Sequence, residues 1–138
     1  MGKIDVRVIR RAPRGDLLRL YREAGWYDPD PPPPGRYIDA IVDGSTCFVG
    51  AFDGGRMIGM GRGLSDGVSD AYIQDVTVLE GYRKRGVGAR IVSAIVRCLR
   101  ARGIDWIVLV AEPGSRAFYR GIGFREMRGF VPMRWRGR

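Results

Sequence analysis

Residues 71–102, AYIQDVTVLEGYRKRGVGARIVSAIVRCLRAR, decide the fold of this chain. Residues 71–79 are rich in β-branched side chains and predict a strand. Residues 86–102 predict an amphipathic helix that ends at a glycine, because large apolar residues recur every four positions at Val87, Ile91, Ile95 and Leu99. A strand that leads through a short turn into a long helix indicates an α/β fold.

The turn between this strand and this helix has the composition of an anion site. It contains two glycines, Gly86 and Gly88, preceded by the cations Arg83, Lys84 and Arg85. The first N–H groups of a helix have no acceptor within the helix, and the helix dipole adds partial positive charge there. Such a turn binds phosphate. It is not a dinucleotide fingerprint, whose third glycine would fall at Ile91, and no Gly-Lys-Ser/Thr follows as in a P-loop.

The segments on both sides predict further short elements punctuated by glycine and proline. Strands are expected at residues 5–9, 46–52, 57–61, 104–111, 124–126 and 130–135, helices at 14–24, 37–44 and 115–121, and an extended proline loop at 28–34. Residues 104–111 show no alternation, which predicts a strand buried on both faces. The order β-α-α-β-β-β-α-β-α-β-β predicts a single mixed α/β domain over residues 1–138.

Composition excludes several classes of protein. The chain has 138 residues, of which 45% are hydrophobic, as in an ordinary globular domain. Its longest apolar run, residues 106–111, is far shorter than the ~20 residues of a membrane-spanning helix, and no signal peptide is evident. The absence of histidine excludes a histidine-based triad and a Cys/His zinc cluster, so no metal is expected. Cys47 and Cys98 lie in apolar segments and are expected to be buried, inert thiols.

The charge is divided unevenly along the chain. Residues 1–80 have a net charge of −2, whereas residues 81–138 carry 14 basic and 3 acidic side chains, a net charge of +11. The basic half is suited to a polyanion such as nucleic acid, an anionic membrane or a phosphorylated small molecule, and a merely solvated basic surface is the alternative.

Two motifs give the chain a strong resemblance to the GNAT superfamily of acyl-CoA-dependent N-acetyltransferases. Residues 83–88, RKRGVG, match that family's Arg/Gln-x-x-Gly-x-Gly/Ala at the start of the central helix. About 35 residues later, Tyr119, Gly123 and Phe124 match its Tyr-x-x-x-Gly-Phe. Many members have asparagine seven residues before the tyrosine, where this chain has Glu112.

The resemblance implies acetyl-CoA as co-substrate and assigns its contacts. The pyrophosphate would be held by backbone amides of Arg85, Gly86, Val87, Gly88 and Ala89. Arg83 and Lys84 would lie near the phosphates, and Arg116 or Arg120 would reach the 3′-phosphate. In the family, two neighbouring strands splay apart, and the exposed backbone of Val76, Thr77 and Val78 would pair with the pantetheine arm.

The resemblance also implies direct attack of a bound amine on the thioester. The N–H near Val76 would polarise the thioester carbonyl, and Tyr119 would protonate the departing thiolate. An alkyl ammonium, with a pKa near ~10, must first lose a proton. Asp75 is the first candidate for the general base, Glu80 the second and Glu112 the third.

The expected protein is therefore a cytoplasmic acetyltransferase that acts on a primary amine, a small molecule rather than a protein, and that could form a homodimer. The alternative is a GNAT fold without turnover that senses acyl-CoA or regulates a partner. A nucleic-acid-binding domain is the third class, but the chain has no helix-turn-helix, zinc or RNA-binding signature. Neither a nucleic acid nor a membrane is expected as a partner.

Overall fold

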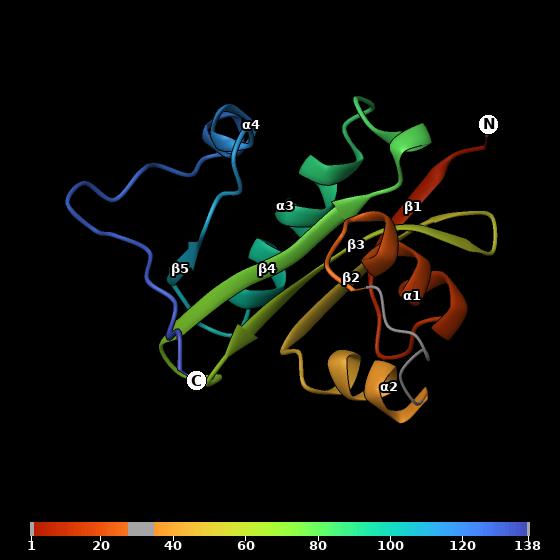
Figure 1. Ribbon diagram of the computed structural model, residues 1–138, viewed down its shortest axis with the longest axis horizontal. Helices are drawn as coiled ribbons and strands as arrows, with labels where there is room; N and C mark the ends of the chain where they lie inside the picture. The colour runs from red at the N-terminus through yellow and green to blue at the C-terminus, as the bar shows by residue number, and fades with distance from the viewer. Residues whose placement is uncertain (1, 28–34, 138) are drawn as a thin grey trace.

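The computed structural model describes residues 2–27 and 35–137. Within them, five strands form one sheet in the order β1-β2-β3-β4-β5, antiparallel except for the parallel pair β4–β5 (Figure 1). The elements are β1 Ile4–Val8, α1 Arg14–Glu23, α2 Gly35–Asp43, β2 Cys47–Asp53, β3 Arg56–Ser65, β4 Asp70–Val78, η1 Glu80–Tyr82, α3 Val87–Arg100, β5 Trp106–Leu109 and α4 Arg116–Gly121.

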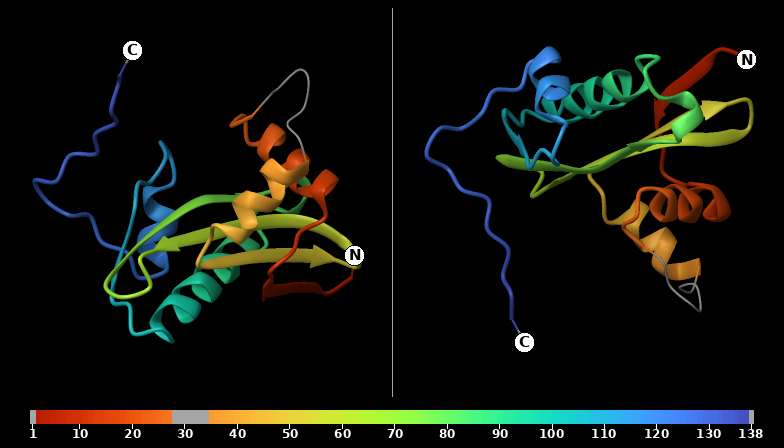
Figure 2. Two further views of the ribbon diagram at one scale, coloured as in Figure 1. Left: turned by 90° about the horizontal axis from the view of Figure 1, so that it is seen from below. Right: turned by 45° about the horizontal axis from the view of Figure 1, so that its top comes forward.

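The two faces of the sheet are covered by different helices. Helix α3 packs on one face and α1 and α2 lie on the other (Figure 2). Three glycines of β3 allow α3 to approach closely, since a Cβ at Gly61 would lie 2.9 Å from side-chain atoms of both Ile91 and Ile95. The apolar stripe predicted for the helix is therefore the stripe that packs against the sheet, and Ile91, Ile95 and Leu99 are fully buried.

The predicted order of elements is confirmed from β1 through α4. The hairpin predicted at Asp53-Gly54-Gly55 joins β2 to β3, and Gly54 has a φ of 62°. Strand β3 extends four residues beyond its predicted end. The prediction of an extended proline loop at residues 28–34 lies outside the described residues. None of the helices found in the described part of the chain is long and apolar enough to span a membrane.

The expectation of inert thiols is wrong. Cys47 of β2 and Cys98 of α3 form a disulfide with their Cα atoms 6.2 Å apart. Both residues lie in the interface between the sheet and α3, so packing of the helix brings together two cysteines 51 positions apart. Neither apolar segment by itself indicates that Cys47 and Cys98 face each other.

Two expectations for the C-terminal part are also wrong. Strand β5 is not buried on both faces, because it lies at the edge of the sheet and Trp106 is 50% exposed. The closing strands predicted at 124–126 and 130–135 are absent, and these residues have no regular secondary structure. Alternation of apolar residues shows that a segment is suited to a strand, but a strand also requires a partner that hydrogen-bonds to it.

Candidate active site

Strands β4 and β5 separate part-way along the sheet. They pair from Asp70 and Trp106 as far as Ile73 and Leu109, after which β4 continues to Val78 without β5 beside it. A cleft of about 920 Å³ occupies the opening. Its walls come from three parts of the chain, namely β4, the turn that begins α3, and residues 110–119 around the start of α4. The backbone N–H and C=O groups of β4 that face the opening have no β5 partner, so they are available to hydrogen-bond a ligand.

A bulge in β4 lies at the point of separation. Met60 of β3 pairs with Thr77 and Arg62 pairs with Gln74, so the single residue Gly61 lies opposite two residues, Asp75 and Val76. Asp75 has a φ of 57°, which is uncommon for a residue other than glycine. Bulges bend a strand and redirect its side chains, and they are frequent beside active sites.

The turn that enters α3 presents backbone amides to the cleft. Gly86 has a φ of 78°, and no side chain among residues 2–27 and 35–137 caps the N-terminus of the helix. Gly86, Val87, Gly88 and Ala89 all line the cleft, together with the cations Arg83 and Lys84. The Nε–H of Arg83 also donates to the Val78 carbonyl (2.8 Å), which ties the turn to the end of β4. Uncapped amides, a positive helix terminus and two cations fit a diphosphate group.

Tyr119 lines the opposite wall of the cleft. It is half-buried, and its ring makes edge-to-face contacts with Phe118 and Phe124 at centroid distances of 4.9 and 5.7 Å. Burial, reinforced by the carboxylate of Glu112, raises the pKa of Tyr119 above the ordinary tyrosine value. The phenol therefore keeps its proton at neutral pH and is available as a hydrogen-bond or proton donor.

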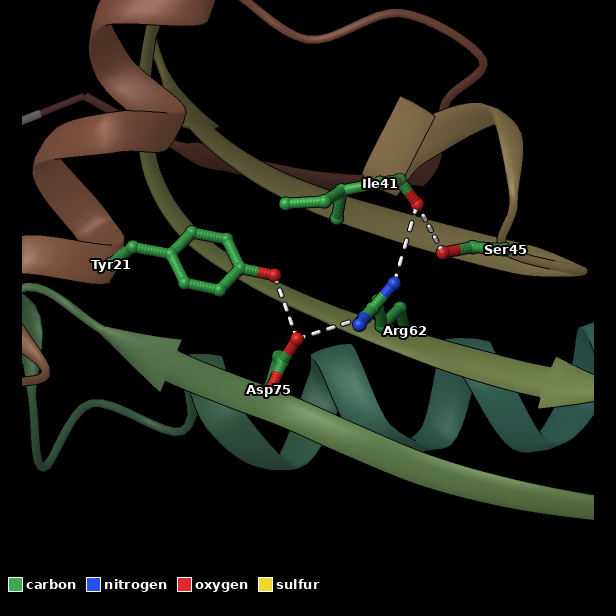
Figure 3. Close-up of polar contacts among 5 residues, drawn as sticks. All are labelled: Tyr21, Ile41, Ser45, Arg62 and Asp75. Carbon is green, nitrogen blue, oxygen red and sulfur yellow. Dashed lines mark hydrogen bonds and ion pairs between the residues drawn. The ribbon is translucent and has the colours of Figure 1, made fainter. Parts of the chain in front are cut away.

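Asp75 is held in a network that connects β4 to three other elements (Figure 3). Its Oδ2 accepts hydrogen bonds from the Tyr21 hydroxyl of α1 (2.7 Å) and from Nε of Arg62 of β3 (2.8 Å). Arg62 also donates to the carbonyl of Ile41 in α2 (3.4 Å). Burial and the hydrogen bond to Asp75 raise the pKa of Tyr21.

A second, smaller cavity of about 240 Å³ adjoins the cleft. Aromatic side chains dominate its lining, with Tyr21, Trp26, Tyr27 and Tyr37 on the helical side and Arg62 and Asp75 on the sheet. Trp26, Gln74 and Asp75 line both spaces. A ligand in the cleft and a ligand in the cavity would therefore meet at these three residues.

Comparison with known proteins decides the family. The model of the acetyltransferase (GNAT) family matches residues 15–124, which include both the α3 turn and Tyr119. The chain belongs to the GNAT acetyltransferase family.

Relatives of this GNAT chain carry several names. It is 32% identical over 113 residues to an uncharacterized ycf52-like N-acetyltransferase of Prochlorococcus marinus, a match over 79% of this chain and 61% of the relative. It is 38% identical over 81 residues to soybean histone acetyltransferase TAP1 (58% of this chain, 35% of that protein). It is 37% identical over 70 residues to rice chloroplastic serotonin N-acetyltransferase 2 (51% and 35%). The chain thus spans less than two thirds of each of these relatives.

Solved structures show the same fold. A GNAT family acetyltransferase of Streptococcus pneumoniae superposes with a TM-score of 0.82 at 24% identity, with 99% of both chains covered. Glucosamine-6-phosphate N-acetyltransferase of Arabidopsis thaliana gives a TM-score of 0.74 at 12% identity, with 99% of this chain and 100% of that chain covered.

The GNAT cleft brings together most of the predicted site residues. Its lining includes Asp75, Val76, Thr77, Val78, Arg83, Lys84, Gly86, Val87, Gly88, Ala89 and Tyr119, and also Glu112. The carboxylate of Glu112 accepts a hydrogen bond from the Trp26 indole (3.2 Å), which connects the end of α1 to the far wall.

Four predicted residues do not line the cleft. The guanidinium of Arg85 lies 5.4 Å from the centre of the Tyr82 ring. Glu80 is exposed in η1. Arg116 and Arg120 both form ion pairs with Glu126, at 3.0 and 2.7 Å.

Sequence reasoning missed Tyr21 and Arg62 as partners of Asp75. Arg62 could have been identified from the sequence, because it is a charged residue in the apolar strand segment MIGMGRGL. Tyr21 could not, since a tyrosine on the apolar face of a helix is typical of core packing.

Proposed function

We propose that this GNAT domain transfers an acetyl group from acetyl-CoA to a primary amine by direct attack within a ternary complex. The observation that carries the proposal is the cleft between β4 and β5, which opens onto the uncapped N-terminus of α3. Acetyl-CoA, when bound, supplies the activated acetyl thioester. A separated strand edge and a positive helix terminus, joined in one cleft, suit a ligand with an amide-bearing arm and a diphosphate.

The donor side of the proposal rests on backbone groups. Amides of Gly86, Gly88 and Ala89 are proposed to hold the diphosphate, with Arg83 and Lys84 adding charge. Beyond Ile73 the edge of β4 has no β5 partner, so Val76 and Val78 are proposed to hydrogen-bond the amide-bearing arm. The N–H of Val76, which lies in the bulge, is proposed to stabilise the oxyanion that forms at the thioester carbon.

Tyr119 is proposed as the proton donor to the leaving thiolate. Its raised pKa supports this role, because the phenol is protonated before the reaction starts. Its position on the wall opposite β4 also supports the role, since a ligand between the two walls would contact both.

The acceptor is proposed to be a small primary amine with an aromatic or apolar body. The cavity beside Asp75 supports this proposal through its size, about 240 Å³, and its ring-lined wall. A carboxylate where the cavity meets the cleft is suited to an ammonium group. The names of two relatives indicate different acceptors, a protein (histone) for one and an arylalkylamine (serotonin) for the other. The proposal of a small amine therefore rests on the size and lining of the cavity.

Asp75 remains the first candidate for the general base, and the network suggests a second role for it. Two donors already occupy its Oδ2, so a proton from the amine would go to Oδ1 or displace Tyr21 or Arg62. The alternative is that Asp75 positions the amine while water removes the proton. Glu112 also lines the cleft, whereas Glu80 does not.

The donor site is tested by calorimetry with CoA. Gly88→Asp places a carboxylate beside the diphosphate, and we expect CoA affinity to fall about a hundredfold or more, which is ~2.7 kcal/mol. Gly88→Ala is the matched control, because its Cβ would lie 3.3 Å from the Phe118 ring and requires only a small shift of that exposed ring. An unchanged affinity in folded Gly88→Asp would refute the proposed diphosphate site.

Turnover is tested by release of free thiol from acetyl-CoA. The panel contains an arylalkylamine, an alkyl diamine and a lysine-containing peptide, and the arylalkylamine is expected to give the largest kcat/KM. CoA binding without thiol release for any amine would favour the acyl-CoA sensor. Salt-dependent DNA binding without CoA affinity would favour the nucleic-acid-binding alternative. A cytoplasmic location stays a prediction.

A further inference from the structure

The cavity beside the cleft contains a cation as well as a carboxylate. Of the described residues that line it, Arg62 and Asp75 are charged, and the others have aromatic, apolar or amide side chains. The two charges cancel, so this described lining has no net charge. A ligand that has only an ammonium group complements Asp75 alone, whereas a zwitterion complements both side chains.

Arg62 has hydrogen-bond donors to spare. Its Nε donates to Asp75 (2.8 Å) and its Nη1 to the Ile41 carbonyl (3.4 Å), as Figure 3 shows. A guanidinium has five N–H donors, and no other group in residues 2–27 and 35–137 accepts from this one. The side chain is only 16% exposed, so the remaining donors need acceptors from whatever occupies the cavity. A carboxylate is suited to them, because it matches the planar fork of an arginine.

The two protein charges lie as close together as those of an α-amino acid. Nε of Arg62 and Oδ2 of Asp75 are 2.8 Å apart. The ammonium and carboxylate groups of an α-amino acid are attached to one carbon atom, so they need protein partners that lie side by side. Tyr21 and Arg62 both donate to Oδ2, which leaves Oδ1 of Asp75 for the ammonium group. An amino acid whose amine lies further from its carboxylate fits this spacing less well.

The positions of the two side chains also set the direction of such a ligand. Asp75 lines both the cleft and the cavity, whereas Arg62 lines the cavity and not the cleft. An amino acid with its carboxylate on Arg62 and its ammonium group on Asp75 therefore has its nitrogen at the junction of the two spaces. The nitrogen then lies on the side of the proposed thioester.

The rest of the cavity is suited to an aromatic side chain. Four rings line it, and those of Tyr27 and Tyr37 are stacked with their centroids 5.8 Å apart. Aromatic rings favour another ring as a neighbour. The volume of about 240 Å³ is below the ~300–1,000 Å³ of pockets that hold drug-sized ligands, which favours a single amino acid over a peptide.

We propose that the acceptor is an aromatic α-amino acid, whose carboxylate binds Arg62 and whose ammonium group binds Asp75. This inference rests on the proposed function and narrows its primary amine to one class. The amine nitrogen bonds to the acetyl carbon as the C–S bond breaks. Of the two protons that the ammonium group loses, one ends on the CoA thiol and the other in solvent. The products are an N-acetyl amino acid and CoA.

Three pairs of amines that differ only by the carboxylate test the proposal. They are phenylalanine and phenethylamine, tyrosine and tyramine, and tryptophan and tryptamine. In the best pair the amino acid is expected to have at least a tenfold larger kcat/KM than its decarboxylated partner. Arg62→Gln is expected to lower this ratio about tenfold or more, because a charge-assisted hydrogen bond is lost. Any effect of the variant on Asp75 acts on both amines, so a merely structural role of Arg62 would leave the ratio unchanged.

Two further variants serve as controls. Arg56→Gln removes the same charge at the exposed start of β3, and Arg56 lines neither space, so the ratio should stay at the wild-type value. Arg62→Lys retains the charge without the planar fork and should restore part of the ratio. If Arg62→Gln does not fold by circular dichroism, Arg62→Lys takes its place, with a ratio below that of the wild type.

Calorimetry with the same amino acids, on protein saturated with CoA, separates this inference from the proposed function. Amino-acid binding that Arg62→Gln weakens about tenfold, without any turnover, would support the carboxylate site and refute acetyl transfer. Turnover in which no amino acid exceeds its decarboxylated partner would overturn the inference and leave the proposed function standing. A ratio that is unchanged in folded Arg62→Gln, or a wild type that neither binds nor acetylates the amino acids, would also overturn it.

Discussion

At the scale of a single residue, the burial of Tyr119 determines the protonation state of its phenol. Its environment keeps the phenol protonated, and it lines the cleft across from β4. We expect Tyr119→Phe to lower kcat about a hundredfold, the range for a lost general acid, with CoA affinity nearly unchanged. Steady-state thiol release measures the first quantity and calorimetry the second.

Tyr72 provides the matched control for this variant. It also lines the cleft and is half-buried, so Tyr72→Phe removes an equivalent hydroxyl from the same space. We expect kcat of Tyr72→Phe to stay within about threefold of the wild type, since the hundredfold effect of a lost general acid applies only to the residue that donates the proton. Near-normal turnover in Tyr119→Phe would assign the proton to water.

Tyr21 makes the stability of the protein depend on alkaline pH. Its pKa is higher in the folded protein than the ordinary value of about 10, because of burial and the bond to Asp75. The folded state therefore retains a proton that the unfolded state loses. The resulting stability is present in full below pH ~10 and is lost progressively above it.

Urea unfolding between pH 8 and 11 measures this dependence. The free energy of unfolding of the wild type should fall as pH rises above about 10. The fall should be smaller in Tyr21→Phe, which has no phenol to ionise at this position. Equal slopes in the two proteins would contradict the Tyr21–Asp75 bond as the source.

At the scale of elements, the disulfide between Cys47 and Cys98 links α3 covalently to β2. It closes a loop between residues 51 positions apart, for which the chain-entropy model gives roughly 4 kcal/mol. The double variant Cys47→Ala/Cys98→Ala should lose stability of this order in chemical denaturation. Reductant should lower the Tm of the wild type and leave the double variant unchanged. A wild-type Tm that survives complete reduction would argue against the stabilising role.

At the scale of the whole molecule, the cleft lies between two parts of the fold whose strands, β4 and β5, no longer pair beyond Ile73 and Leu109. Strand β4 and the α3 turn form one wall, and residues 110–119 form the other. A ligand that bridges the walls stabilises only the folded state. CoA at a hundredfold excess over its Kd should therefore add about 2.7 kcal/mol to the free energy of unfolding. Thermal denaturation should show a higher Tm, and Gly88→Asp should reduce the shift. An unchanged Tm at saturating CoA would contradict binding in the cleft.

The sequence by itself determined the features that depend on neighbours along the chain. The four-residue apolar period of α3 predicted the face that packs on the sheet, and Asp53-Gly54-Gly55 predicted a hairpin from its local turn geometry. Gly86 and Gly88, with the cations before them, predicted an anion site because helix termini always leave amides without acceptors, and the structure places both glycines in the lining of the cleft. Tyr119 was predicted as a site residue because its spacing from Gly123 and Phe124 matches the motif of the family that the chain resembles.

Only the tertiary structure decided which distant residues meet. Tyr21 and Arg62 reach Asp75 from α1 and β3, a bulge opposite Gly61 turns that carboxylate toward them, and Cys47 faces Cys98 across the core. The same holds for residues 130–135, whose alternation is that of a strand but which pair with no strand in the part of the chain that the structure describes. Apolar periodicity is a property of one segment, whereas a hydrogen bond, a disulfide or a strand pair belongs to two segments, and their pairing follows from the packing of the whole chain.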